Sequence, residues 1–190
     1  MVKGRMEAFS DGVIAILITI MVLELRPPDG TTLASLGPIA PTLGCYVLSF
    51  VFIAIYWNNH HHLLQAVKQV TGPILWANMH LLFWLSLVPF VTDWMGEHFA
   101  SGPVAAYGVV LLCAGTAYYI LARLLIATQP DSALARAVGS DVKGQISVVI
   151  YAVAIVAAFY EPWVSCALYV CVAILWLVPD RRIERELTHH

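Results

Sequence analysis

Six long apolar segments, separated by short polar or proline-containing connections, make up most of the 190-residue chain. They lie at roughly 6–25, 40–60, 74–94, 104–125, 143–160 and 162–179. Each is close to the ~20 apolar residues that an α-helix needs to cross a bilayer. The pattern therefore predicts an all-α membrane protein with six transmembrane helices, in a single domain that covers residues 1–190.

Turn-forming residues mark the ends of these segments. Pro27-Pro28-Asp29-Gly30 follows the first segment, and Gly72-Pro73 and Gly102-Pro103 precede the third and the fourth. Tyr160-Glu161-Pro162 leaves room only for a short hairpin between the last two. The longest connection is expected at about 126–142, which contains both proline and glycine.

Composition agrees with a membrane location and narrows the classes of partner. Apolar residues make up 60% of the chain and charged residues only 12%, whereas charged residues are about 25% of a soluble domain. The net charge of −2 gives no reason to expect a nucleic-acid partner. The cysteines lie inside apolar segments without metal-binding spacing, so we expect them to pack, and we expect neither a metal nor a cofactor. They are Cys45, Cys113, Cys166 and Cys171.

The distribution of lysine and arginine predicts the orientation. If the N-terminus is cytoplasmic, nine of the ten basic residues fall on the inner side and only Arg26 falls outside. The nine are Lys3, Arg5, Lys68, Arg123, Arg136, Lys143, Arg181, Arg182 and Arg185. By the positive-inside rule, both termini of a multi-pass protein of the cell membrane are then cytoplasmic.

The first segment joins ionisable residues directly to an apolar helix. At 100° per residue, one face of this helix is apolar except for a threonine, while Ser10 and Asp11 point away from it toward neighbouring helices. That face consists of Gly12, Ile16, Thr19, Ile20 and Leu23. The pattern alone leaves open whether the face lines a pathway, packs against another helix or contacts lipid.

Polar side chains also gather in the second and third segments. Trp57, His60 and His61 close the second segment, and Asn78, His80 and Trp84 lie in the third. Adjacent histidines on a helix diverge by 100° and cannot converge on one ion, so we expect hydrogen bonding and not metal binding. Polar groups within a membrane need partners, which favours a packed cluster between helices over an ion or proton relay.

The pattern Arg-x-x-x-Phe-Ser-Asp at residues 5–11 resembles the signature of the transmembrane protein 175 family of potassium channels. The Tyr-Trp-x-x-His pattern at 56–60 and the third segment, which ends in Pro89-Phe90, are similar to the partners of that signature. The resemblance implies six-helix subunits that form a homotetramer, with the first helix of each lining a central pore. It assigns Ile16, Thr19, Ile20 and Leu23 to the pathway, with the three aliphatic residues forming a hydrophobic constriction.

The resemblance therefore implies a channel selective for K⁺ among monovalent cations. The chain contains no Thr-Val-Gly-Tyr-Gly-like loop, which excludes the carbonyl type of selectivity filter. Glu24 is the acid best placed at the outer mouth. The alternative is a proton-coupled or other secondary transporter, which would need inverted repeats or broken helices. An enzyme would need a catalytic pair at membrane depth, and we do not expect one.

We assign the signature residues to assembly and to an inter-helix polar network, not to filtering. The network comprises Arg5, Phe9, Ser10, Asp11, Trp57, His60, His61, Asn78, His80 and Trp84. Within it we expect Asp11 to contact His60 or His61, together with aromatic or histidine side chains of the third segment. We also expect Arg5 to be drawn aside and neutralised, by Asp11 or by Glu7 of an adjacent subunit.

Overall fold

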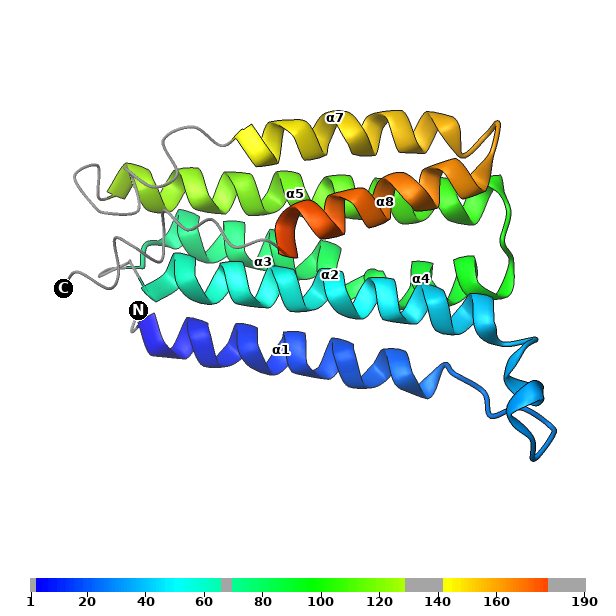
Figure 1. Ribbon diagram of the computed structural model, residues 1–190. Coiled ribbons are helices and arrows are strands. Elements are labelled where there is room, and N and C mark those ends of the chain that lie inside the picture. Colours follow the sequence, from blue (N-terminus) through cyan, green and yellow to red (C-terminus); the bar gives the residue numbers. More distant parts are fainter. Residues whose placement is uncertain (1–2, 66–69, 129–141, 178–190) are drawn as a thin grey trace.

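The computed structural model is a bundle of helices that run roughly along one direction (Figure 1). It describes residues 3–65, 70–128 and 142–177. The helices are α1 (Lys3–Leu23), α2 (Ala40–Gln65), α3 (Gly72–Ser86), α4 (Val88–Glu97), α5 (Ser101–Thr128), α7 (Val142–Ala157) and α8 (Pro162–Leu177), with a short 3₁₀ turn, η1 (Leu33–Leu36). The described residues contain no strand, which confirms the predicted all-α class.

Four of the predicted segments form apolar helices long enough to cross a membrane. They cover Lys3–Leu23, Ala40–Gln65, Gly72–Glu97 and Ser101–Thr128. The fifth and sixth correspond to the shorter apolar helices α7 and α8. Of the predicted connection at 126–142, residues 129–141 lie outside the described part of the chain, as do Lys68, Arg136, Arg181, Arg182 and Arg185.

The third segment continues through its proline. Leu87 is in the right-handed helical region, with φ −86° and ψ −13°, and links α3 to α4. Its amide donates to the Trp84 carbonyl over 3.2 Å, and its own carbonyl accepts from the Val91 amide over 3.1 Å. Pro89 lies in the first turn of α4, where its missing N–H costs no helical hydrogen bond. The chain at Leu87 and Pro89 is therefore a local tightening within one membrane-length element, Gly72–Glu97.

The bundle is ordered from α1 at one side to α7 at the other (Figure 1). α1 packs against α2, α3 and α4, whereas α7 packs mainly against α5 and α8. The start of α1, the end of α5 and the start of α7 lie at the same end of the bundle (Figure 1). We call this the N-terminal end, and the end that holds η1 and the α7–α8 turn the opposite end.

A group of buried hydroxyls joins three helices in the core. Ser49 on α2 lies 2.7 Å from the Thr92 hydroxyl on α4 and 2.9 Å from the Tyr107 hydroxyl on α5. Thr92 also donates to the Val88 carbonyl. All three side chains are at least 95% buried, and because each hydroxyl is paired, the cluster avoids the cost of an unsatisfied polar group.

Close packing of α5 against α8 depends on a glycine. A Cβ at Gly108 would collide with the Tyr169 hydroxyl and would lie 2.8 Å from the Ile155 side chain. Tyr169 is fully buried, and its hydroxyl donates to the Val104 carbonyl over 3.0 Å. A side chain at position 108 would therefore displace Tyr169 from its hydrogen bond.

Candidate functional site

α1 has one packed face and one uncovered face. The packed face consists of Met6, Ser10, Ile14, Leu17 and Met21, all buried against the bundle. On the other side, Ile16 is 57% exposed, Ile20 40% and Leu23 77%. In a single subunit, the side chains assigned to the pathway thus form an uncovered apolar stripe along the helix.

Thr19 lies on the same uncovered side. Its hydroxyl donates within the helix, to the Ile16 carbonyl at 2.9 Å or the Ala15 carbonyl at 3.3 Å. The donor is therefore satisfied without any group from another helix. Its oxygen retains acceptor capacity toward whatever faces the stripe.

On the packed face, three buried side chains form a hydrogen-bonded chain across three helices. His60 Nε2 on α2 lies 2.7 Å from Asn78 Oδ1 on α3. Asn78 Nδ2 donates to Ser10 Oγ on α1 over 2.9 Å, and Ser10 Oγ donates to the Met6 carbonyl over 2.9 Å. These side chains are at most 2% exposed. Because Asn78 Oδ1 is an acceptor, His60 carries its proton on Nε2, and every bond in the chain points toward α1.

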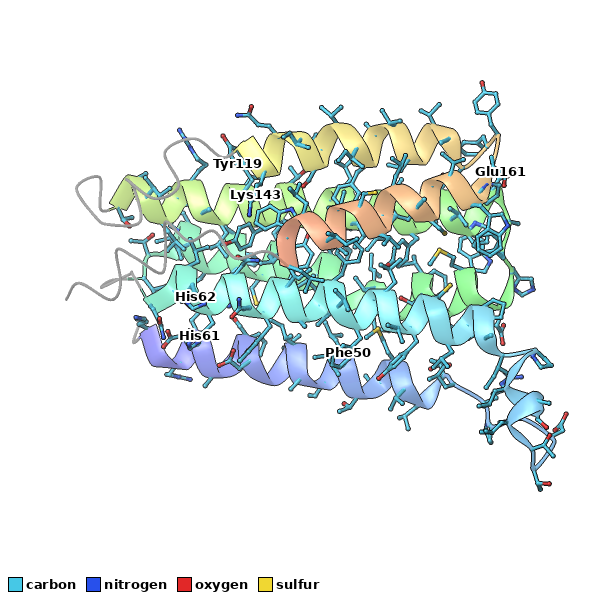
Figure 2. The ribbon with its side chains drawn as sticks, in the orientation of Figure 1. Phe50, His61, His62, Tyr119, Lys143 and Glu161 are labelled. Atoms are coloured by element: carbon cyan, nitrogen blue, oxygen red, sulfur yellow. The ribbon has the colours of Figure 1, made fainter. Side chains whose placement is uncertain are left out.

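Asp11 has a different partner from the one predicted. The Trp57 indole Nε1 donates to Asp11 Oδ1 over 3.0 Å. The Trp57 ring stacks on His61, with centroids 5.8 Å apart, and His61 Nε2 lies 2.8 Å from Gln65 Nε2. His61 and His62 lie near the N-terminal end of the bundle (Figure 2). The prediction of an Asp11–histidine contact is wrong because α2 presents the indole to the carboxylate and turns His60 inward to Asn78.

His80 and Trp84 form a separate pair on α3. Trp84 Nε1 donates to His80 Nε2 over 2.9 Å, and the His80 side chain is exposed. In the described structure, neither residue is hydrogen-bonded to His60, Asn78 or Ser10. The predicted network is therefore divided into three groups. The chain of His60, Asn78 and Ser10 is buried between helices, and Asp11 and Trp57 join α1 to α2. His80 and Trp84 lie on the uncovered side of α3, where Trp76 is 79% exposed.

Only some of the charged side chains at the start of α1 have partners among the described residues. Lys3 Nζ lies 3.7 Å from Glu7 Oε1 and donates to the Gln65 carbonyl over 3.1 Å, which ties α1 to the end of α2. Arg5 is exposed and forms no ion pair with the described residues of its own chain. Phe9, also in the signature, is 52% exposed.

Acidic side chains gather at the opposite end of the bundle. Glu24 is exposed and lines a small depression together with Asp93. Glu97 lies 3.7 Å from Arg26. Both members of this pair are well exposed, so it contributes little to stability. In the described residues, no group of three or more His, Cys, Asp or Glu side chains is placed to hold a metal ion.

Sequence reasoning did not find the Ser49–Thr92–Tyr107 cluster. Each of these residues is a single hydroxyl within an apolar run, and a single hydroxyl can also bond to its own helix. Only the rotation of α2, α4 and α5 about their axes brings the three together.

Comparisons with known proteins point to one family of channels. A model of the family described as the endosomal/lysosomal potassium channel TMEM175 matches residues 5–89. A potassium channel of Chryseobacterium sp. strain P1-3 is 52% identical over 189 residues, which cover 98% of each chain. A potassium channel of Streptomyces collinus is 35% identical over 128 residues, 63% of this chain and 62% of that one.

Among solved structures, one that matches is the crystal structure of a lysosomal potassium-selective channel TMEM175 homolog from Chamaesiphon minutus. The TM-score is 0.82 at 26% sequence identity, and the match covers 94% of this chain and 97% of that one. The similarity thus extends over nearly the whole chain.

Proposed function

Since the chain belongs to the TMEM175 channel family, we propose that it is a potassium-selective channel, built from four copies around a central pathway lined by α1. The observation that carries the proposal is the uncovered stripe of Ile16, Ile20 and Leu23 on a helix whose other face is packed into the bundle. Four such stripes facing one axis would enclose a narrow apolar passage. Monovalent cations, and K⁺ among them, are the proposed permeant species.

In this passage the aliphatic side chains form the constriction. Rings of isoleucine and leucine exclude water when the passage is narrow, so ring size controls conduction. Thr19 adds an acceptor oxygen between two of the rings. Glu24, one turn beyond Ile20, places negative charge at one mouth and raises the local concentration of cations there. A carbonyl filter has no part in this proposal.

The signature residues hold α1 in place and hold the subunits together. Ser10 and Asp11 bind α1 to α3 and α2 within one subunit. Arg5 is exposed at the start of α1 and finds no partner among the described residues of its own subunit. We assign its partner to Glu7 or Asp11 of the adjacent copy. Removing Arg5 then weakens the tetramer and leaves the subunit fold intact.

The proposed orientation follows from the charges at the two ends of the bundle. Lys3, Arg5, Arg123 and Lys143 lie toward the N-terminal end, and Arg26 lies at the opposite end. By the positive-inside rule the N-terminal end is cytoplasmic, and the acidic end with Glu24 faces outward.

Ion flux through the purified protein in liposomes tests the proposal. A channel dissipates an imposed K⁺ gradient rapidly, with a rate that does not saturate at low concentration and needs no counter-transported ion. The alternative, a proton-coupled transporter, requires saturable exchange linked stoichiometrically to H⁺. Parallel measurements with Na⁺ and H⁺ gradients report selectivity. Flux that saturates and stops without a proton gradient would show that the protein is a carrier and would overturn the channel proposal.

A further inference from the structure

A cavity of about 430 Å³ lies between α2, α5, α7 and α8, away from α1. It is toward the N-terminal end of the bundle, where Tyr119 lies beside the start of α7 (Figure 2). Two of its lining residues, Tyr119 and Val148, are each 44% exposed. The cavity therefore opens sideways between α5 and α7, on a surface that faces the bilayer in the proposed assembly, in which α1 lies at the central axis. Its volume lies in the range of about 300–1,000 Å³ typical of small-molecule sites.

The walls are aromatic. Six of the fourteen described lining residues carry rings: Phe52, Tyr56, Tyr118, Tyr119, Tyr151 and Trp176. Gly115 leaves one side open, because a Cβ there would meet only the Tyr56 hydroxyl at 3.6 Å. Flat aromatic walls beside a glycine leave a slot that suits a planar ring.

One hydroxyl that faces this cavity has no hydrogen-bond partner among the described residues. Tyr151 lines it and is 4% exposed, and its hydroxyl forms no hydrogen bond with any residue that the structure describes. The nearby Tyr56 hydroxyl has only a long contact of 3.5 Å to the Leu111 carbonyl. A hydroxyl that faces a mostly apolar cavity without a partner is costly at membrane depth. The cavity thus offers at least one free O–H donor to an acceptor on a ligand.

The charge of the ligand also follows from the lining. None of the fourteen described residues that form the cavity is charged. An ionised ligand would lose its hydration without gaining a counter-charge, which is strongly unfavourable. A plain acyl chain would fit the apolar walls, but it would leave the Tyr151 hydroxyl unpaired.

We propose that this cavity binds a neutral, planar ring compound that carries a carbonyl acceptor, of the membrane-soluble quinone type. The ring lies between the aromatic side chains next to Gly115, and a carbonyl oxygen accepts the Tyr151 O–H. The ligand enters from the bilayer, past Tyr119 and Val148. This site is separate from the ion pathway assigned to α1.

Two matched probes test the carbonyl requirement. Duroquinone is a fully methylated benzoquinone that cannot add cysteine thiols, and durene has the same methylated ring without carbonyls. Equilibrium dialysis against the full chain in lipid nanodiscs, with empty nanodiscs subtracted, gives the saturable binding of each. We expect duroquinone to bind about three- to tenfold more tightly than durene, as one hydrogen bond provides. Equal binding of the two would mean a site for any apolar chain, lipid included, and would overturn the proposal.

Two variants locate the site and the donor. Tyr151→Phe removes only the hydroxyl, so it should bring duroquinone down to the affinity of durene, whereas Tyr46→Phe, outside the cavity, should change neither. Gly115→Leu fills the slot and should abolish saturable binding of both probes. Gly44→Leu is its control, because a Cβ at that position meets no atom within 4 Å.

A second route blocks the cavity from its mouth, in case Gly115→Leu disturbs the packing of α5. Val148→Trp changes an exposed residue and should also abolish saturable binding, with helix content and elution volume unchanged. Retention of wild-type duroquinone binding in a folded Gly115→Leu or Val148→Trp protein would place the ligand elsewhere. If the Tyr151→Phe protein still binds duroquinone more tightly than durene, the Tyr151 hydroxyl does not recognise the carbonyl.

Discussion

The Trp57 indole nitrogen lies 3.0 Å from an Asp11 carboxylate oxygen and donates the hydrogen bond that ties α2 to the start of α1. Asp11 is half-buried, and this is the only hydrogen bond that its carboxylate forms with a described residue. A hydrogen bond to an ionised group is stronger than one between neutral groups. The acid of the signature is therefore held by an indole, a donor that does not titrate.

Trp57→Phe should lower the thermal unfolding midpoint of the purified protein by about 3–6 °C. The phenyl ring keeps the stack on His61 but leaves the carboxylate without a donor. Trp94→Phe is the control, since Trp94 is 40% exposed and contacts Phe90 through its ring alone. An unchanged midpoint in Trp57→Phe would mean that water replaces the indole without loss.

Asn78→Leu should destabilise the fold by at least about 2 kcal/mol, because it leaves buried polar groups on His60 and Ser10 without partners. Ser10→Ala should cost less in the Asn78→Leu background than in the wild type, since the two share one hydrogen bond. Denaturant unfolding of the four proteins of this cycle measures the coupling. If the stability losses of Asn78→Leu and Ser10→Ala simply add in the double variant, the two hydrogen-bonded side chains do not act as a unit.

Ile16→Ala and Leu17→Ala form a matched pair, one on the uncovered face of α1 and one on its packed face. Ile16 is 57% exposed and Leu17 6% exposed. We expect Ile16→Ala to raise K⁺ current and weaken discrimination against Na⁺ with little change in stability. Leu17→Ala should instead cost about 2–5 kcal/mol of stability by opening a cavity. Bilayer recordings and thermal unfolding separate the two effects, and identical permeability ratios in Ile16→Ala and wild type would argue against a pathway along this stripe.

Arg5→Ala should reduce the fraction of tetramer, seen by size-exclusion chromatography with light scattering, before it alters the helix content of the subunit. Lys3→Ala is the comparison, because Lys3 is paired within its own chain. A stable Arg5→Ala tetramer with altered selectivity would assign Arg5 to the ion pathway instead.

Gly108→Ala and Gly44→Ala should change stability in opposite directions. The first places a methyl group against Tyr169 and should cost about 1–3 kcal/mol through overpacking. The second adds a methyl group in open space on a helix and should stabilise by about 0.5–1 kcal/mol. Tyr169→Phe removes the hydroxyl that is in the way and should reduce the cost of Gly108→Ala.

The helices themselves were predictable because segment length and hydropathy depend on nothing beyond the sequence. The direction in which Ser10 and Asp11 point was predictable for the same reason, since helical periodicity is local. Their partners were not. Trp57 and His60 are three residues apart on α2, so both lie within reach of α1, and the rotation of α2 decides which one meets the carboxylate.

The two buried hydrogen bonds that run from His60 through Asn78 to Ser10 also restrict how α1 can move. Turning α1 about its own axis by one residue, about 100°, would replace Ser10 by Phe9 or Asp11 at the Asn78 amide. Such a turn would break the bond to Asn78 and leave polar groups unpaired inside the membrane. A lateral or tilting movement that carries α2 and α3 along with α1 breaks neither of them. In an assembly of four copies, the passage would thus widen when α1, α2 and α3 of each copy move away from the axis as one rigid unit. It would not widen by rotation of α1 about its own axis.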